Sequence, residues 1–362
     1  MKVGVFGAGN MGGHVIEHLD GFEGVQDIIV YDIKEQHLNE VSKLYKVQTT
    51  HHINDVLNDP EVRLVFIATT NATHKVLTLQ ALEAKKAVMC EKPMATTLSD
   101  ALQMVKCVEQ CGGYLQIGFE LRYSKLYTTV KRWIDANLLG RLINTYCYYS
   151  ISSWRKGEWR VKKEIAGSMF GEKLSHYVDL PRWWIGSPVI DVFARSAPNI
   201  IPYYEVRDNY HAIYRFENGA VSHLTCMMGL PTATAAYDPM MKAQHKDELS
   251  KLGYVLKYVV VGTKGVVKTD TFGRSIERWE FIEDQDCFTS KLAEKLTWDE
   301  QDNHSYYHNT LDQTRDVVRR VARGLPPKTS PRDAYATMKL CFAAEESADR
   351  GELVKLEDIG EE

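Results

Sequence analysis

The chain lacks the features that mark membrane proteins, nucleic-acid-binding proteins and disulfide-rich secreted proteins. Its longest apolar runs, such as RLVFIATT, are far shorter than the roughly 20 residues that cross a membrane as a helix. A formal net charge of −4 leaves no basic field that would attract nucleic acid or anionic lipid. The seven cysteines form no CxxC pair, so we expect reduced thiols. The sequence therefore predicts a protein that binds neither membranes nor nucleic acid.

Internal repeats and low-complexity segments are also missing. The first residues, MKVGVFGAG, are typical of a strand, so we expect no signal peptide and a cytoplasmic location. At 362 residues, with 44% hydrophobic and 25% charged residues, the chain has the composition of a soluble globular protein. Its length predicts two domains.

Apolar and amphipathic segments alternate over the first 120 residues. Continuously apolar runs predict buried strands at residues 2–7, 27–32, 62–69, 86–91 and 114–119. The segments between them predict helices at residues 10–19, at 34–45, from 72 onwards, and at 98–111. Apolar strands separated by helices are typical of a parallel sheet covered on both faces. Residues 1–121 are therefore predicted to form a doubly wound Rossmann domain.

The pattern changes after residue 121. Amphipathic segments predict helices at residues 124–136, 308–324 and 330–351. Alternating stretches predict antiparallel strands at residues 142–152, 189–197, 210–216, 220–228 and 254–270, with a hairpin at Asn218-Gly219. Residues 122–362 are thus predicted to form an α+β domain with an open, largely antiparallel sheet, and the final helix and tail are expected to pack back toward the first domain. Because one face of such a sheet needs cover, we expect a homodimer or homotetramer through it.

The motif GAGNMG lies between the first predicted strand and the first predicted helix, and an aspartate follows at the end of the second strand. This arrangement predicts a dinucleotide site, because bare glycines permit a tight turn and a close approach to a pyrophosphate. The carboxylate of Asp32 suits the two adenosine ribose hydroxyls and would repel a 2′-phosphate, so NAD is favoured over NADP. The predicted contacts here are Gly7, Gly9, Asn10, Met11, Gly12 and Asp32.

Two further motifs end the third and fourth predicted strands on the same edge of the sheet, where ligands of such sheets bind. TTNATH contributes Thr69, Asn71 and His74, and CEKP contributes Glu91 and Lys92, all expected to contact the cofactor. For His74, packing at a helix start is an alternative interpretation. Lys92 is also expected to hydrogen-bond a substrate hydroxyl, although a solvent-facing lysine beside a paired Glu91 would fit the same position.

The order and spacing of these motifs resemble one known family. GAGNMG, Asp32, TTNATH, EKP and GEKLSHYVDLPRWW are similar to motifs of the Gfo/Idh/MocA family of NAD(P)-dependent oxidoreductases. The resemblance extends through RYSKLYTTVKRWIDANLLGRL and SPRDAYATMKLCFAAEESADRGELVKL, so it covers nearly the whole chain. It implies a Rossmann domain, a C-terminal α/β domain whose open sheet forms the oligomer interface, and substrates that are mostly sugars, cyclitols and their derivatives.

The resemblance also implies roles for individual side chains. The lysine of EKP, Lys92, would contact the reacting hydroxyl, often beside a cis peptide before the proline. His176, in a helix that faces the cofactor, would be the general acid/base. Many members carry an aspartate four residues before this histidine and a glycine two before it, whereas this chain has Glu172 and Leu174 with Lys173 between them. We therefore expect substrate identity and the pairing of His176 to be decided there.

Oxidation of a secondary alcohol requires a hydride acceptor, a base and a positive donor at one carbon. At helical spacing Glu172, His176 and Asp179 share one face, so either carboxylate is expected to fix the imidazole tautomer. Asp179 has two other interpretations, a contact to a substrate hydroxyl or packing alone. The predicted catalytic residues are Lys92, His176 and Glu172.

Further substrate contacts are predicted in segments near this helix. The loop SSWRKGEWRVKKE carries aromatic and guanidinium groups that suit a sugar ring, a carboxylate or a phosphate, although a solvated flap is an alternative. The predicted substrate contacts are Lys92, Arg122, Tyr123, Trp154, Arg155, Glu172, Lys173, His176 and Asp179. His304 and His308 lie four residues apart, but no H-E-x-x-H motif accompanies them, so a polar helix start is favoured and no metal is expected.

These residues favour an NAD-dependent dehydrogenase of a sugar or cyclitol. An alternative is a redox-neutral enzyme in which transient oxidation acidifies a neighbouring C–H bond, elimination cleaves a glycoside, and the hydride returns. A less favoured third possibility is a non-catalytic NAD-sensing regulator, which would be expected to lack the lysine or the histidine. Both are present, as Lys92 and His176.

Overall fold

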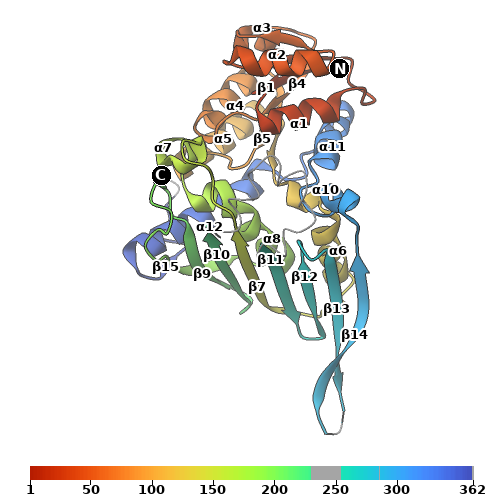
Figure 1. Cartoon of the computed structure of the whole chain (residues 1–362), viewed down its shortest axis with the longest axis vertical. Coiled ribbons are helices and arrows are strands. Elements are labelled where there is room, and N and C mark those ends of the chain that lie inside the picture. Colours follow the sequence, from red (N-terminus) through yellow and green to blue (C-terminus); the bar gives the residue numbers. More distant parts are fainter. Residues whose placement is uncertain (230–253, 285, 361–362) are drawn as a thin grey trace.

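The computed structural model describes residues 1–229, 254–284 and 286–360, which form two sheets and the helices that pack on them (Figure 1). The first sheet lies within residues 2–118 and the second takes its strands from residues 142–355. A parallel doubly wound sheet followed by a largely antiparallel one is the predicted fold class, which is confirmed. The boundary at residues 121 and 122 remains a proposal, and it falls between the two sheets.

The first sheet has six parallel strands in the order β3-β2-β1-β4-β5-β6. Its strands are β1 (Lys2–Phe6), β2 (Asp27–Tyr31), β3 (Gln48–Thr50), β4 (Val62–Ile67), β5 (Ala87–Glu91) and β6 (Leu115–Gly118). The helices that connect them are α1 (Asn10–Leu19), α2 (Glu35–Leu44), α3 (Ile53–Leu57), α4 (His74–Glu83) and α5 (Leu98–Cys111). Strand order reverses between β1 and β4, where ligands of such sheets bind beyond the carboxyl ends.

One strand of this sheet has no sequence signal. β3 has only three residues, all polar, and two of them are exposed. It forms because its backbone pairs with β2 at the edge of the sheet. The other five strands are largely apolar and lie where the sequence predicts them, because most of their side chains are buried on both faces.

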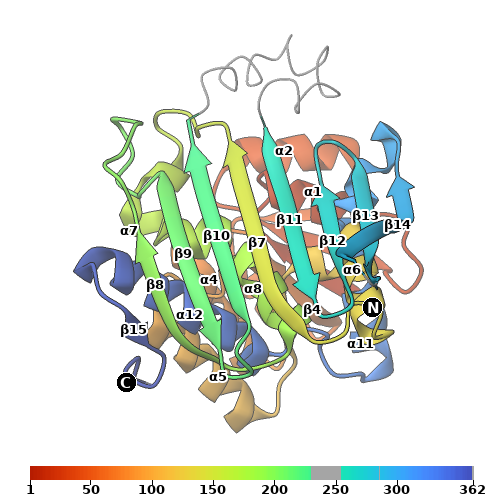
Figure 2. The same cartoon turned by 90° about the horizontal axis from the view of Figure 1, so that it is seen from below.

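The second sheet has nine strands in the order β14-β13-β12-β11-β7-β10-β9-β8-β15 (Figure 2). Its strands are β7 (Leu142–Ile151), β8 (Val189–Arg195), β9 (Asn209–Phe216), β10 (Val221–Met228), β11 (Val255–Gly262), β12 (Gly265–Asp270), β13 (Ser275–Glu283), β14 (Phe288–Thr297) and β15 (Val354–Lys355). Neighbouring strands are antiparallel except β7 and β10, which are parallel. The predicted Asn-Gly hairpin joins β9 to β10.

The hairpin of β13 and β14 is not predicted by the sequence. It extends beyond the other strands, away from the first sheet (Figure 1). β14 is exposed along nearly its whole length, so no buried face imposes an alternating pattern on its residues. β14 nevertheless pairs with β13, so backbone hydrogen bonds extend the sheet into a segment that has no alternating hydrophobic pattern.

In the part of the chain that the structure describes, the helices lie on one face of the second sheet, and Figure 2 looks onto the other face with these helices behind it. The helices that follow the first sheet in the chain are α6 (Lys125–Asp135), α7 (Lys163–Ala166), α8 (Ser175–Ile185), α10 (Asn303–Tyr306), α11 (Thr310–Arg323) and α12 (Pro331–Arg350), of which α11 packs against α1. Along β7, Cys147 and Tyr149 are buried, whereas Tyr146 and Tyr148 are 44% and 42% exposed. The sheet is therefore open, as predicted.

Helix α12 links the two halves of the chain. It packs against α5 of the first half and against α8 and β8 of the second. Tyr335 and Met338 belong to the apolar core of the first sheet, while Leu340 and Cys341 belong to that of the second. The final helix thus fixes the first sheet against the helical layer that carries His176. Within the described residues, no helix is long and apolar enough to span a membrane.

Candidate active site

The glycine motif forms a bare turn before α1. Gly7 has φ +89°, and its amide donates to the Tyr31 carbonyl at 2.8 Å. A Cβ atom on Gly12 would lie 1.8 Å from the Gly7 carbonyl oxygen, so only glycine fits there. Gly9 directly precedes α1, and the amides of Asn10 and Met11 begin the helix with its positive dipole end. This cradle of backbone fits the pyrophosphate of a dinucleotide.

Asp32 lies beside this turn at the end of β2. Its carboxylate accepts the Ala8 amide at 2.7 Å and the Lys34 amide at 2.8 Å, and it contacts His37 Nδ1 at 3.0 Å. Burial raises the pKa of Asp32, but these hydrogen bonds outweigh burial and hold the pKa below its ordinary value. A fixed carboxylate next to the glycine turn fits the ribose of a dinucleotide that lacks a 2′-phosphate.

The ends of β4 and β5 are tied to each other by a histidine. The ring of His74 is buried, with Nδ1 2.7 Å from the Pro93 carbonyl and Nε2 3.2 Å from the Thr69 carbonyl. Burial lowers its pKa. The peptide bond between Lys92 and Pro93 is cis, as the resemblance implies. His74 therefore holds the backbone around Lys92, and a direct contact between its ring and the cofactor stays a prediction.

Lys92 and Glu172 meet across the junction of the two halves. Lys92 Nζ donates to the Glu172 carbonyl at 2.7 Å and lies 3.7 Å from Glu172 Oε2. Asn71 Nδ2 donates to Glu172 Oε2 at 3.0 Å, and Arg160 Nε donates to Oε1 at 2.9 Å. Burial opposes ionisation of Glu172, but Lys92, Arg160 and Asn71 together hold its pKa below the ordinary value. Both carboxylate oxygens of Glu172 are therefore occupied, one by Arg160 and the other by Asn71 and Lys92.

Glu172 does not pair with His176, so the predicted orienting role of Glu172 is wrong. Residues Phe170–Leu174 form a π-helical turn, and the α-helical turns of α8 start only at Ser175. A π-helical turn is wider than an α-helical one, so positions on either side of it lose the three- and four-residue spacing of one face. Glu172 consequently points to Lys92 and Arg160 instead.

The carboxylate beside His176 is Glu120, which the sequence does not single out. Glu120 lies two residues after β6, next to the end of β5, and only 2% of the residue is exposed. Its Oε1 is 3.1 Å from His176 Nε2 and 2.6 Å from His308 Nδ1. His176 Nε2 therefore faces Glu120, whereas Nδ1 of the same ring is buried without a hydrogen-bonding partner among the described residues.

His308 directly precedes Asn309, the N-cap of α11, so it lies at a helix start as predicted, and its contact with Glu120 also places it in the site. It follows α10, which ends at Tyr306, and its side chain is 42% exposed. Its ring lies 6.1 Å from that of His176. No group of three or more histidine, cysteine, aspartate or glutamate side chains among the described residues is arranged to hold a metal ion.

Asp179 also does not orient His176. It accepts hydrogen bonds at 2.7 Å from Arg122 Nε, from Arg122 Nη2 and from Thr337 Oγ1, and 1% of it is exposed. Arg122 additionally bonds Asp333 at the start of α12. Arg122 and Asp179 thus neutralise each other at the domain junction, so neither is free to hold a substrate as the sequence predicts.

Replacement of Arg122 by methionine is expected to lower the free energy of unfolding by about 3–5 kcal/mol, because Asp179 would keep a buried charge with only Arg182, 4.0 Å away, to balance it. Urea unfolding measures this difference. Arg332→Met is the matched control, since its pair with Glu109 is half-exposed and such pairs contribute about 0–1 kcal/mol. Equal losses in the two variants would contradict the assignment.

Lys173 lies between the two halves of the site. Burial and the neighbouring charge of Lys92 lower its pKa to about 8. Its Nζ sits over the Tyr149 ring, 5.5 Å from the centroid, and no carboxylate of the described residues lies within ion-pair distance of it. Its charge also acts on His308. The contact of Lys173 with substrate stays a prediction.

Three other predicted substrate contacts lie elsewhere. Trp154 is 6% exposed and stacks on Tyr204 at 5.7 Å, so it is a core residue. The Tyr123 hydroxyl donates to Asp316 of α11 at 2.8 Å and is occupied there. Arg155 is exposed, and its amide donates to Glu158 at 3.2 Å. These positions make Trp154 and Tyr123 structural, while the role of Arg155 stays a prediction.

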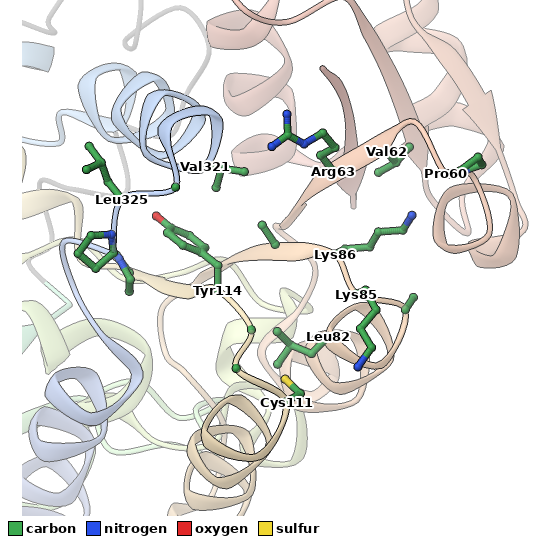
Figure 3. A pocket seen from close by; sticks show the side chains of 17 residues that line it. Pro60, Val62, Arg63, Leu82, Lys85, Lys86, Cys111, Tyr114, Val321 and Leu325 are labelled. Atoms are coloured by element: carbon green, nitrogen blue, oxygen red, sulfur yellow. The ribbon is translucent and has the colours of Figure 1, made fainter.

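A hollow of about 840 Å³ lies away from these residues (Figure 3). It is lined by Val62 and Ala87, which start β4 and β5, and by Val321 and Leu325 near the end of α11. Parallel strands bind ligands at their carboxyl ends, and this hollow is at the amino ends. It is therefore separate from the site built by Asp32 and Lys92.

Glu91 is expected to make the stability of the folded protein depend on pH. Burial, followed by the negative charge of Glu120, raises the pKa of Glu91 to about 8. The folded state then binds more protons than the unfolded state above pH 4.5, so stability should fall as the pH rises toward 8, by up to about 1.4 kcal/mol per pH unit. Glu91→Gln is expected to remove this decline, measured by urea unfolding between pH 5 and 8.5. The exposed Glu83→Gln serves as control, and a decline that persists in Glu91→Gln would refute the prediction.

Two family models match the chain. Residues 1–119 match an oxidoreductase family with an NAD-binding Rossmann fold, and residues 127–268 match the GFO/IDH/MocA C-terminal domain. Together the two matches cover the first sheet and strands β7 to β11 of the second, and they include Gly7, Asp32, Lys92 and His176.

Several known proteins are similar over long stretches. The myo-inositol 2-dehydrogenase of Thermotoga maritima is 22% identical over 377 aligned residues, which cover 99% of each chain. The inositol 2-dehydrogenase of Salmonella typhimurium is 29% identical over 188 residues, 51% of this chain and 54% of that one. The solved structure of levoglucosan dehydrogenase with NADH and levoglucosan has a TM-score of 0.80 at 20% identity, covering 98% of this chain and 99% of that one. That structure shares the fold.

Proposed function

The chain belongs to the Gfo/Idh/MocA family of oxidoreductases, and on that basis we propose that it is an NAD-dependent dehydrogenase acting on a secondary hydroxyl of a sugar, a cyclitol or a derivative of either. Its named relatives support the substrate class, since two are inositol dehydrogenases and one solved neighbour is a levoglucosan dehydrogenase. The bare glycine turn and the ionised Asp32 support NAD rather than NADP.

One observation carries the proposal most directly. Lys92 and the buried Glu120 follow adjacent parallel strands, since Glu91 of β5 pairs with Gly118 of β6. The carboxyl ends of parallel strands meet at one edge, which is also the edge of the glycine turn and Asp32. A cation, a carboxylate and two imidazoles are thus brought to the edge that the cofactor would occupy.

These groups match the needs of alcohol oxidation. NAD, when bound, accepts the hydride. The ammonium of Lys92 is held by the Glu172 carbonyl and can stabilise the alkoxide that develops on the substrate. The cluster of Glu120, His176 and His308 can accept the hydroxyl proton. Glu172 positions Lys92, and Asn71 and Arg160 fix Glu172, so the donor is preorganised.

Redox-neutral glycoside cleavage is a second candidate function. Elimination after transient oxidation needs a further base, and Lys173 with its pKa of about 8 supplies a titratable group beyond those needed for dehydrogenation. The two functions differ in their products. Release of one NADH per oxidised substrate supports dehydrogenation, whereas glycoside cleavage without net NADH supports elimination.

The deciding experiment is a screen of NAD reduction with sugars, inositols, uronates and glycosides, with NADP in parallel. We expect NADH formation with at least one of these polyols and much slower reaction with NADP. Absence of reaction with the entire panel would count against the proposed function, and a preference for NADP would refute the role of Asp32.

We further infer that two or four copies of the chain associate through the open face of the second sheet. Tyr146, Tyr148 and Ile213 are each more than 40% exposed on that sheet. Burying such aromatic and aliphatic side chains in a symmetric interface would stabilise the assembly. The double substitution Tyr146→Lys and Tyr148→Lys is expected to yield monomers in light-scattering measurements at micromolar concentration, whereas Ile33→Lys, on the exposed surface of the first domain, should not. A monomeric wild type would contradict this inference.

A further inference from the structure

We propose that Glu120, from the first half of the chain, is the carboxylate that orients His176 of the second half and stabilises its protonated ring. This role rests on the proposed function, with His176 as the general acid/base that the resemblance implies. Glu120 thereby takes the part that the sequence predicts for Glu172. It is a positioning residue, and it completes the base across the junction of the two halves.

Glu120 reaches His176 from the edge of the first sheet. It lies two residues after β6, next to the end of β5, and so at the edge where the cofactor would bind. His176 lies in α8, in the helical layer of the second sheet. Glu120 Oε1 is 3.1 Å from His176 Nε2, and the two residues are 2% and 3% exposed. Because little water reaches this contact, the carboxylate acts on the imidazole with little screening.

Glu172 is not available for this role. Its two oxygens accept hydrogen bonds from Arg160 and Asn71, and its backbone carbonyl accepts the ammonium of Lys92 at 2.7 Å. The groups of the site are therefore held crosswise. Lys92 of the first half is held by a residue of the second half, whereas His176 of the second half is held by a residue of the first.

A second imidazole fixes Glu120 in place. His308 Nδ1 lies 2.6 Å from Glu120 Oε1, a short distance that is typical of a hydrogen bond to an ionised acceptor. An ionised carboxylate can only accept, so His308 donates from Nδ1. Burial opposes the ionisation of Glu120, but His176 and His308 outweigh burial and hold its pKa well below the ordinary value. Glu120 is thus charged at neutral pH, as an orienting carboxylate has to be.

The other titratable groups near this pair are Glu91, His308 and Lys173. Burial, followed by the charge of Glu120, raises the pKa of Glu91 to about 8, so Glu91 is largely protonated at neutral pH. Burial lowers the pKa of His308, and the charges of His176 and Lys173 lower it further, although Glu120 opposes the shift. Glu120 is therefore the negative charge that contacts His176 at neutral pH.

Glu120 acts on the proton transfer without taking part in it. The hydroxyl O–H bond breaks as its proton passes to His176, and the C–H bond breaks as its hydride passes to NAD. The products are a carbonyl, NADH and a protonated His176, whose proton is released before the next turnover. The carboxylate beside the ring stabilises this positive charge as it forms, as the carboxylates of catalytic dyads do. Its effect on the rate is therefore exerted through His176.

Glu120→Gln tests this role with the polyol identified by the screen. We expect kcat to fall about 10- to 10³-fold with nearly unchanged KM and NAD affinity. The acidic limb of the pH profile of kcat should move to lower pH, because the protonated ring loses its anion. Glu120→Asp keeps the charge and should recover part of both. Glu83→Gln, on the exposed surface of α4, is the matched control. A wild-type kcat and pH profile in Glu120→Gln would overturn the proposal.

A double-mutant cycle separates positioning from a structural role. His176→Gln should lower kcat by about 10²–10⁴-fold, because the base is lost. Glu120→Gln introduced into His176→Gln should lower kcat little further, since the group through which Glu120 acts is already missing. Losses that multiply in the double variant would contradict the assignment.

Nuclear magnetic resonance of protein labelled with nitrogen-15 histidine tests the contact without any substrate. The signals of His176, assigned by their loss in His176→Gln, should titrate at lower pH in Glu120→Gln than in the wild type. Glu120→Asp should titrate between the two, so the comparison holds even if Glu120→Gln does not fold. An unchanged titration of His176 in both variants would refute the proposal. A protein that shows the expected titrations yet reduces no NAD with any polyol would count against the proposed function alone.

Discussion

Lys92→Met should lower kcat by about 10²–10³-fold while the affinity for NAD stays nearly constant, because the variant loses the positive donor at the developing alkoxide. Methionine keeps the length of the side chain, so the loss reports the charge and the hydrogen bond. Steady-state kinetics with the substrate from the screen, together with NAD titration by fluorescence, measures the two effects separately.

The structure supplies a matched control and a second readout for this variant. Lys75 pairs with Asp100 on the surface at 2.7 Å, away from the cofactor edge, so Lys75→Met should leave kcat unchanged. The positive charge of Lys92 also contributes to the low pKa of Lys173, so Lys92→Met should raise the pKa of Lys173 above about 8. A wild-type kcat in Lys92→Met would show that Lys92 does not stabilise the alkoxide.

Gly12→Ala should weaken NAD binding about 10- to 100-fold, the second-largest effect expected here. The new Cβ would lie 1.8 Å from the Gly7 carbonyl oxygen, so the turn has to shift, at a cost of about 1–3 kcal/mol for overpacking. Because the turn and the amides that follow it form the cradle for the pyrophosphate, the shift should lower both the affinity for NAD and the stability of the folded protein.

Gly13→Ala separates the clash from a general effect of alanine in α1. A Cβ on Gly13 would meet no atom within 4 Å, and alanine favours a helix interior over glycine. Gly13→Ala should therefore bind NAD as the wild type does and unfold at a slightly higher temperature. Equal NAD affinities for the two variants would show that the turn is not the nucleotide cradle.

The parts of the protein whose conformation depends on residues close together in the chain can be predicted from the sequence. The glycine turn needs only the bare backbone of residues 7–12, and the continuously apolar strands of the first sheet need only burial on both faces. The motifs that end β4 and β5 are placed by the strands themselves, so the positions of Asn71 and Lys92 at the cofactor edge are predictable. The fold class and the family are confirmed for the same reason.

Elements that lack a local signal are not predictable in this way. β3 is short and polar, and β14 is exposed along its length, so each is held by backbone pairing with a neighbour. The expected pairing of Glu172 with His176 fails because the π-helical turn at Phe170–Leu174 breaks the spacing of an α-helix. Asp179 lies in α8 with His176 but is occupied by Arg122 and Thr337. Nothing in the order of residue types distinguishes that turn from an α-helical one.

The sequence by itself therefore determined where a dinucleotide and a lysine would meet, because turns and strand ends are set by neighbouring residues. Only the tertiary structure decided which groups surround His176. Glu120 and His308 are 188 positions apart along the chain and meet within 2.6 Å, and Arg122 and Asp179 neutralise each other across 57 positions. Such pairs depend on how the helical layer packs against the first sheet, and the distance along the chain between two charges carries no information about that packing.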